Sequence, residues 1–347
     1  MSNAIVKQRD ITWDCVKGLA MILVVVGHSG CPSGIHRFIY LFHMGLFFYI
    51  SGLFIKKGSS ISDFKTFAWK KVKGLYKPYV VWAVFFILIH NVCVQWGWTV
   101  EENYSFITIL KHCVNAATFR HLEPMLVPFW FLRSLFFASI ISWFVICVKR
   151  KWIQIVIVML FYGLACLYDW LGSPIQHLPM MFNRDAGIVL AVWLGYSMKD
   201  FHYLLNVWQT SGVLMLLIIG SLFFDVFITD GIFGPVLVFP VATVLGVLLT
   251  YNVAKWLSQY KHLKQFLSFV GQHTIEILAL HLLSFHVLST LFVRMGIGHS
   301  KELVFAETLK YVALPIPVAW LLYSVVGIVL PLSFVMIKSK IIQLAHR

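Results

Sequence analysis

The sequence predicts an all-α, polytopic integral membrane protein with about ten transmembrane helices and both termini in the cytoplasm. Of its 347 residues, 60% are apolar, against about 45–50% in an ordinary soluble domain. Charged residues make up only 12%, and mean hydropathy is +0.83. Ten spans of ~20 residues need about 200 residues, which this chain supplies with short loops between them. A disordered chain and a soluble multi-domain enzyme are excluded.

The predicted spans follow one another along the whole chain. They lie at 12–29, 36–55, 77–97, 127–148, 152–169, 184–198, 203–224, 232–254, 270–293 and 312–337. The first is not a signal peptide, because it lacks a small-x-small cleavage site and carries Asp14 and Lys17. No internal repeat or long linker interrupts the pattern, so residues 1–347 are predicted to form a single membrane-embedded domain.

The basic residues predict the orientation. Outside the predicted helices, 19 of 26 lysines and arginines fall in one set of alternate segments, the set that includes both termini. The positive-inside rule places that set in the cytoplasm. The net charge of +14 is therefore interpreted as topological, and no nucleic-acid partner is expected. The six cysteines have no CxxC spacing, which indicates buried free thiols.

Four charged residues, Asp14, Lys17, Arg133 and Glu276, lie within apolar runs. A charge at the bilayer centre costs at least ~2.5 kcal/mol, so such residues usually face a wet cavity or a partner. The alternative is that they lie near helix ends and reach the interface. For Arg133 and Glu276, a turn or more inside the run, the cavity is the favoured interpretation.

The first predicted helix carries the most informative pattern. Lys17 and His28 are eleven residues apart, close to three full turns, so they share one face and lie about 16 Å apart along the axis. Asp14 is on the same stripe and within reach of Lys17. The stripe favours a functional His28 over a packing histidine.

Other candidate residues surround this stripe. His43 is predicted at a depth similar to that of His28, either in the same cavity or bonded to a backbone carbonyl. Trp130 and Arg133 lie one turn apart, an arrangement suited to a sugar or an anion. His273, Glu276 and His281 fall within about two turns, but no second half of a metal site matches them, so no metal is expected. Lys70, Lys71 and Lys73, in the predicted loop before the third span, are either topological charge or a phosphate cradle.

These motifs together resemble the integral-membrane acyltransferase-three family, and within it the branch related to fucose 4-O-acetylases. The first, D-x-x-[R/K]-G followed by V-V-x-G-H, runs from Asp14 to His28. The others are F-H-M-x-L-F-F-x-x-S-G at 42–52, L-x-x-P-Y at 75–79, W-F-L at 130–132, and a late G-x-x-[S/T]-x-x-[I/L] that begins at Gly271 and leads to His281. The resemblance covers most of the chain.

The resemblance implies transfer of an acyl group, usually acetyl, from cytosolic acyl-CoA to a hydroxyl of an envelope or exported carbohydrate. It implies His28 as the essential histidine and Lys17 as the basic residue of the first helix, where arginine is commoner. The family's R-x-x-R motif is poorly kept, with Lys71 at one position and Gly74 at the other. Acyl-CoA is then a co-substrate and no cofactor is bound. The short loops suggest a bacterial inner-membrane protein.

Two other classes of function remain open from the residues alone. A transporter or flippase of a glycan precursor also places charges in a membrane cavity, although no inverted repeat or pair of broken helices is seen. A non-catalytic partner in an envelope complex is the third class, and the short loops offer little surface for it.

Overall fold

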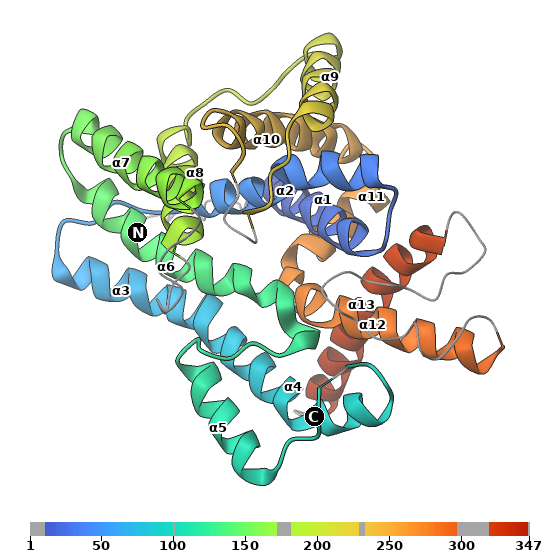
Figure 1. The fold of residues 1–347 in the computed structure, drawn as a ribbon. Coiled ribbons are helices and arrows are strands. Elements are labelled where there is room, and N and C mark those ends of the chain that lie inside the picture. The colour runs from blue at the N-terminus through green and yellow to red at the C-terminus, as the bar shows by residue number, and fades with distance from the viewer. Residues whose placement is uncertain (1–10, 100, 172–181, 229–232, 297–318, 346–347) are drawn as a thin grey trace, which may run out of the picture.

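The computed structural model describes residues 11–99, 101–171, 182–228, 233–296 and 319–345, and in these residues the regular elements are helices (Figure 1). In chain order they are α1 (Ile11–His28), α2 (Ser33–Leu53), α3 (Ile61–Lys71), η1 (Val72–Tyr76), α4 (Lys77–Gln95), α5 (Phe106–Ala117), η2 (Pro124–Phe129), α6 (Trp130–Cys147), α7 (Lys151–Trp170), α8 (Phe182–Ser197), α9 (Val207–Phe223), α10 (Val238–Leu257), α11 (Lys261–Gln272), α12 (Thr274–Arg294) and α13 (Ala319–Ala345).

Each of the ten predicted spans overlaps one of these helices, namely α1, α2, α4, α6, α7, α8, α9, α10, α12 and α13. Within the described residues, seven helices are long and apolar enough to cross a membrane. The chain is thus a helical membrane protein, but the count of ten spans is not confirmed. The cytoplasmic location of both termini remains a prediction.

The segment before α4 is helical, which corrects the prediction that it is a loop. A capping box starts α3, because the Ser60 side chain accepts from the Asp63 backbone while the Asp63 carboxylate accepts from the Ser60 backbone. One π-helical turn, η1, then joins α3 to α4 in a continuous helix of 35 residues. Lys70, Lys71 and Lys73 therefore lie on a helix.

A second difference lies between the third and fourth predicted spans. The stretch after α4 forms the short helix α5, which runs back along α4 (Figure 1). Near one end of α5, the Asn91 side chain bonds to the backbone of Tyr104. At the other end, the Tyr76 hydroxyl donates to the Ala117 carbonyl. The chain then returns through η2, whose six residues include Pro124 and Pro128, into α6.

The closest approach of α1 to another helix depends on two glycines. A Cβ at Gly18 would overlap the carbonyl oxygen of Leu267, and a Cβ at Gly271 would overlap that of Asp14. Small residues allow two backbones to touch in this way. The contact fixes α1 against α11, and α12 follows directly after α11.

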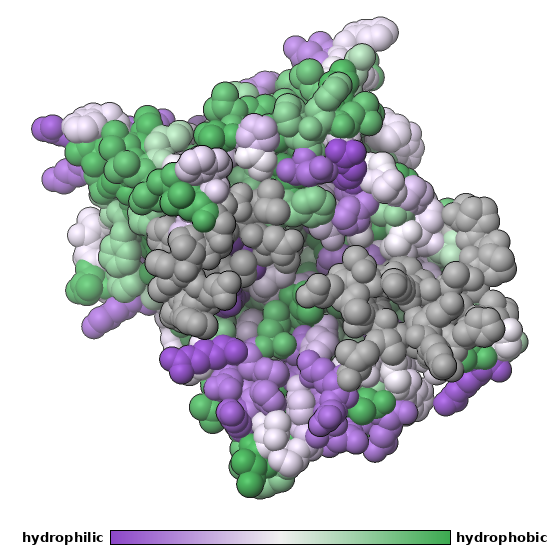
Figure 2. Space-filling view, viewed as in Figure 1, coloured by the Kyte–Doolittle hydropathy of each residue, from purple (hydrophilic) through white to green (hydrophobic). Residues whose placement is uncertain are grey.

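The surface has the character of a lipid-facing protein. Figure 2 shows hydrophobic side chains over α7, α9 and α10, and hydrophilic side chains gathered near α4 and α5. On α9, large apolar residues such as Trp208, Met215 and Phe223 are exposed. In water such a surface would be an aggregation hazard, whereas in a bilayer it faces acyl chains.

Candidate active site

A small cavity of about 30 Å³ lies inside the helix bundle. It is lined by four parts of the chain: Met21, Val24 and His28 of α1; Tyr40, His43, Met44 and Phe47 of α2; Pro128, Trp130 and Phe131 of η2 and α6; and Leu278 of α12. Most of these side chains are apolar. Two imidazoles therefore supply much of the polarity of the cavity wall.

His28, at the end of α1, is hydrogen-bonded to His281 of α12. Nδ1 of His28 lies 2.8 Å from Nε2 of His281. The ring planes are 12° apart and the ring centroids 5.1 Å apart. Nδ1 of His281 lies 3.0 Å from the carbonyl oxygen of Ile277. The structure thus joins His28 and His281, which are 253 positions apart in the sequence.

His43 satisfies both interpretations that the sequence left open. It lines the cavity with His28, and its Nδ1–H donates to the Ile39 carbonyl at 2.8 Å. Because Nδ1 carries the proton, Nε2 carries the lone pair. His43 is 2% exposed, so its ring is held in place by the surrounding helices.

Toward the other end of α1, Lys17 and Asp14 form the ion pair that their spacing allows. Nζ of Lys17 lies 2.7 Å from Oδ1 of Asp14, and the lysine side chain is 26% exposed. The pair lies beside the close contact between α1 and α11. One helix therefore carries a cation near its start and an imidazole at its end, about 16 Å apart.

Comparison with known protein families identifies the chain. A family model for the acyltransferase-three family, described as an acyltransferase domain, matches residues 10–336. The chain belongs to the acyltransferase-three family. Comparison with curated proteins gave no match, and neither did comparison with solved structures. The protein is therefore a membrane acyltransferase, and nearly the whole chain is its acyltransferase domain.

The lysine cluster of this acyltransferase has a defined setting on α3 and η1. Lys71 donates from Nζ to the Ser51 hydroxyl at the end of α2, 3.2 Å away. Lys73 lies over the Trp69 ring, with Nζ 5.3 Å from the centroid. Lys70 is exposed. The three lysines do not line the His28 cavity, so any role in binding a donor concerns its distant phosphates.

Arg184, which was not among the predicted site residues, lies over the ring of Trp130, while Arg133 lies one turn further along α6 as its spacing predicts. The guanidinium carbon of Arg184 lies 4.7 Å from the centre of the Trp130 ring. Asp185 is fully buried, and neither of its carboxylate oxygens has a hydrogen-bond partner in the part of the chain that the structure describes. The sequence does carry a signal for these two residues, because Arg184 and Asp185 are adjacent charges at the start of the apolar run 184–198.

Arg133 itself is partly buried and does not line the cavity. Its Nε and Nη2 atoms are buried, and they have no hydrogen-bond partner within the described ranges. A buried donor without a partner is costly.

Glu276 lies apart from the two cavity histidines. Its carboxylate is 3.8 Å from Nδ1 of His273, and its side chain is 29% exposed. His281 bonds to His28 instead. Among the residues that the structure describes, no group of three His, Cys, Asp or Glu side chains has the arrangement of a metal site.

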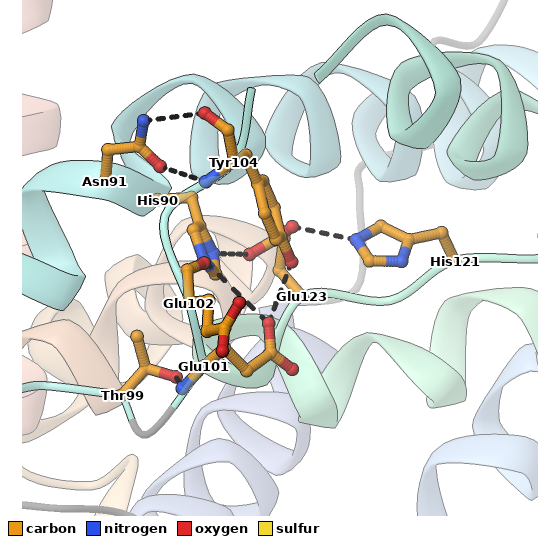
Figure 3. Close-up of polar contacts among 8 residues, drawn as sticks. All are labelled: His90, Asn91, Thr99, Glu101, Glu102, Tyr104, His121 and Glu123. Atoms are coloured by element: carbon orange, nitrogen blue, oxygen red, sulfur yellow. Dashed lines mark hydrogen bonds and ion pairs between the residues drawn. The ribbon is translucent and has the colours of Figure 1, made fainter. Parts of the chain in front are cut away.

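A second polar cluster was not predicted. Figure 3 shows the buried Glu123 carboxylate between two histidines, with Nδ1 of His90 at 2.9 Å and Nε2 of His121 at 2.8 Å. The Tyr104 ring stacks on His90 with centroids 3.4 Å apart. These residues come from α4 and from the segments on either side of α5, which gave no periodic signal in the sequence.

This cluster fixes the start of the segment that leads to the cavity, since Glu123 directly precedes η2. Burial alone would raise the pKa of the Glu123 carboxyl. The hydrogen bonds from His121 and His90, with the charges of the two rings, outweigh burial and lower the pKa below its ordinary value of 4.5. Glu123 therefore stays ionised and holds both imidazoles.

Proposed function

We propose that this membrane acyltransferase moves an acyl group, acetyl as the first expectation, from cytosolic acyl-CoA to a hydroxyl of an envelope or exported carbohydrate. In this proposal it acts as the fucose 4-O-acetylases do, in a bacterial inner membrane. The observation that carries the proposal is the pair of His28 and His281 at a cavity inside the bundle. Acyl transfer to a hydroxyl needs a base, and imidazole suits that role near neutral pH.

The proposed reaction is a direct transfer. The hydroxyl oxygen attacks the thioester carbon while His28 accepts the hydroxyl proton. The carbon–sulfur bond then breaks, and the sulfur takes the proton from His28 to leave as the free thiol of CoA. Two features of Ser29 argue against an acyl-serine intermediate: the residue is fully buried, and its hydroxyl donates to the Val26 carbonyl at 2.8 Å.

In this scheme the acyl-CoA donor and the acceptor reach His28 from opposite sides. Lys17 and the lysines at 70, 71 and 73 would contact the phosphates of CoA. Asp14, which is paired with Lys17, would line the path along α1. The acyl arm would pass along α1 to His28. The acceptor would approach by way of His43, Trp130 and Arg133, where the unused donors of Arg133 suit a hydroxyl-rich or anionic molecule. Glu276 has no assigned contact in this scheme.

The size of the cavity sets a condition on this mechanism. Its volume of about 30 Å³ is far below the ~300–1,000 Å³ of a typical ligand pocket. The reacting groups of two substrates therefore require the surrounding helices to separate. In this proposal the small cavity belongs to a closed form of the protein that opens to admit substrate.

The test is release of CoA by the purified protein. Acetyl-CoA is incubated with candidate carbohydrates, and free CoA and the mass of each carbohydrate are measured; acetylation adds about 42 Da. His28→Ala should lower turnover ~10²–10⁴-fold while unfolding temperature and CoA affinity are retained. His286→Ala, which removes another buried imidazole, should keep normal turnover. A transporter releases no CoA, and full activity of folded His28→Ala would contradict the assignment of the base.

A further inference from the structure

We infer that His281 is a positioning residue that holds His28 as the tautomer with its proton on Nδ1, so that the basic lone pair is on Nε2. The catalytic consequence rests on the proposed function, in which His28 is the base. The inference itself rests on a chain of hydrogen bonds whose direction can be worked out from one end.

The series of hydrogen bonds begins at the carbonyl oxygen of Ile277, which can only accept a hydrogen bond. Nδ1 of His281 lies 3.0 Å from this oxygen, so that nitrogen carries a proton. His281 is fully buried, and a charged imidazolium at such a position would be costly. The ring is therefore neutral, and its Nε2 carries a lone pair.

The next bond follows from the first. Nε2 of His281 lies 2.8 Å from Nδ1 of His28. Since Nε2 accepts, Nδ1 of His28 donates and carries the proton. In the neutral His28 ring only one nitrogen is protonated, so Nε2 is the basic nitrogen. This is the form that can take a proton from a hydroxyl.

The ring geometry supports a directional bond. The planes are within 12° of parallel, and the centroid separation of 5.1 Å greatly exceeds the distance between the bonded nitrogens. These values describe rings that meet edge to edge and nearly in one plane. The lone pair of His281 then points along the N–H bond of His28, as a strong hydrogen bond requires.

The backbone explains why this contact is fixed. Gly18 and Gly271 bring α1 and α11 together, and each histidine lies ten residues beyond the glycine of its own segment. The helices α1 and α12 meet at this distance from the contact, through the bond between the two rings. A residue held in this way orients a catalytic histidine as the acid of a serine-protease triad does.

The experiment reads the tautomer directly by ¹⁵N NMR of histidine-labelled protein, with the His28 signals assigned by their loss in His28→Ala. The unmodified protein should show His28 protonated on Nδ1. Protonation on Nε2 there would overturn the inference without any variant. This result is independent of turnover, so it separates failure of the inference from failure of the proposed function.

Two substitutions then test the consequence. His281→Gln keeps an oxygen that can accept from His28 and should retain the tautomer and most of the turnover. His281→Leu removes the acceptor, so His28 should shift toward the Nε2–H form and turnover should fall at least tenfold, with CoA affinity unchanged. The matched control, His286→Leu on the same helix, should alter neither the tautomer of His28 nor the turnover. Unchanged turnover in folded His281→Leu would overturn the positioning role, while loss of turnover in His28→Ala alone would leave the proposed function standing.

Discussion

Substitution of Gly271 by alanine should test how strictly the α1–α11 contact sets the site. The added Cβ would overlap the carbonyl oxygen of Asp14 and press on the backbone of Gly18. Both neighbours are backbone atoms, so no side chain can rotate away. Overpacking typically costs ~1–3 kcal/mol, and relief of the glycine's helix penalty returns at most ~1 kcal/mol. We expect Gly271→Ala to lose about 2 kcal/mol of stability and most of its turnover, because α1 must move away from α11.

A thiol-reactive fluorophore can report the unfolding temperature, since Cys15 and Cys93 are buried and react only after unfolding. The four partly exposed cysteines react in the folded protein and set the signal before heating. The matched control is Gly212→Ala on α9, where an added Cβ would meet nothing within 4 Å. The control should unfold at or slightly above the temperature of the unmodified protein. If Gly271→Ala unfolds with the control and keeps full turnover, the contact does not set the position of His28.

Two other predictions follow from the charged residues. Lys17→Ala should weaken CoA binding roughly 10- to 100-fold, the effect of losing one charged hydrogen bond, whereas Lys17→Arg should bind CoA normally. Calorimetry in detergent measures both affinities, with Lys255→Ala as the control. If Lys17→Ala and the control bind CoA equally well, Lys17 has no role in binding the donor. The lowered pKa of Glu123 stabilises the fold above the ordinary pKa of 4.5, and this contribution is lost as pH falls through the lower folded-state pKa. Glu123→Gln should therefore be less stable at pH 7 and lose less stability on acidification, as measured by unfolding temperature from pH 7 down to well below 4.5. Parallel pH curves would contradict this account.

Seven helices among the described residues are long and apolar enough to cross a membrane. Their positions could be predicted because a bilayer imposes a length and an apolar composition on each span. The same rule does not predict helices that do not cross a bilayer. α3 and α11 are short and rich in lysine, and α5 lies in a stretch of mixed polarity. Their starts are set by local features, such as the capping box at Ser60, that are weak signals within a hydrophobic chain.

The site was predictable only along a single helix. The spacing of Asp14, Lys17 and His28 predicts one face of α1, and the structure contains the Asp14–Lys17 ion pair that this spacing allows. Contacts between helices distant in the sequence depend on rotation and register, which periodicity does not determine. The bond between His28 and His281, the contact of Arg184 with Trp130, and the Glu123 cluster are all contacts of this kind.

One side of the cavity is held by a hydrogen bond and by close backbone contacts, and the other side is held only by apolar contacts. α1 and α12 are joined by the histidine pair, and α1 touches α11 through glycines, so separating them would destroy the proposed base. The opposite wall is formed by α2 and by η2 with the start of α6, which meet through apolar rings such as Phe47 and Phe131, 5.5 Å apart. Helical geometry is broken in η2 at Leu126, and aromatic contacts can slide without leaving a polar group unpaired. We therefore expect the closed cavity to open for substrate between α2 and η2, while α1 and α12 keep His28 in its tautomer.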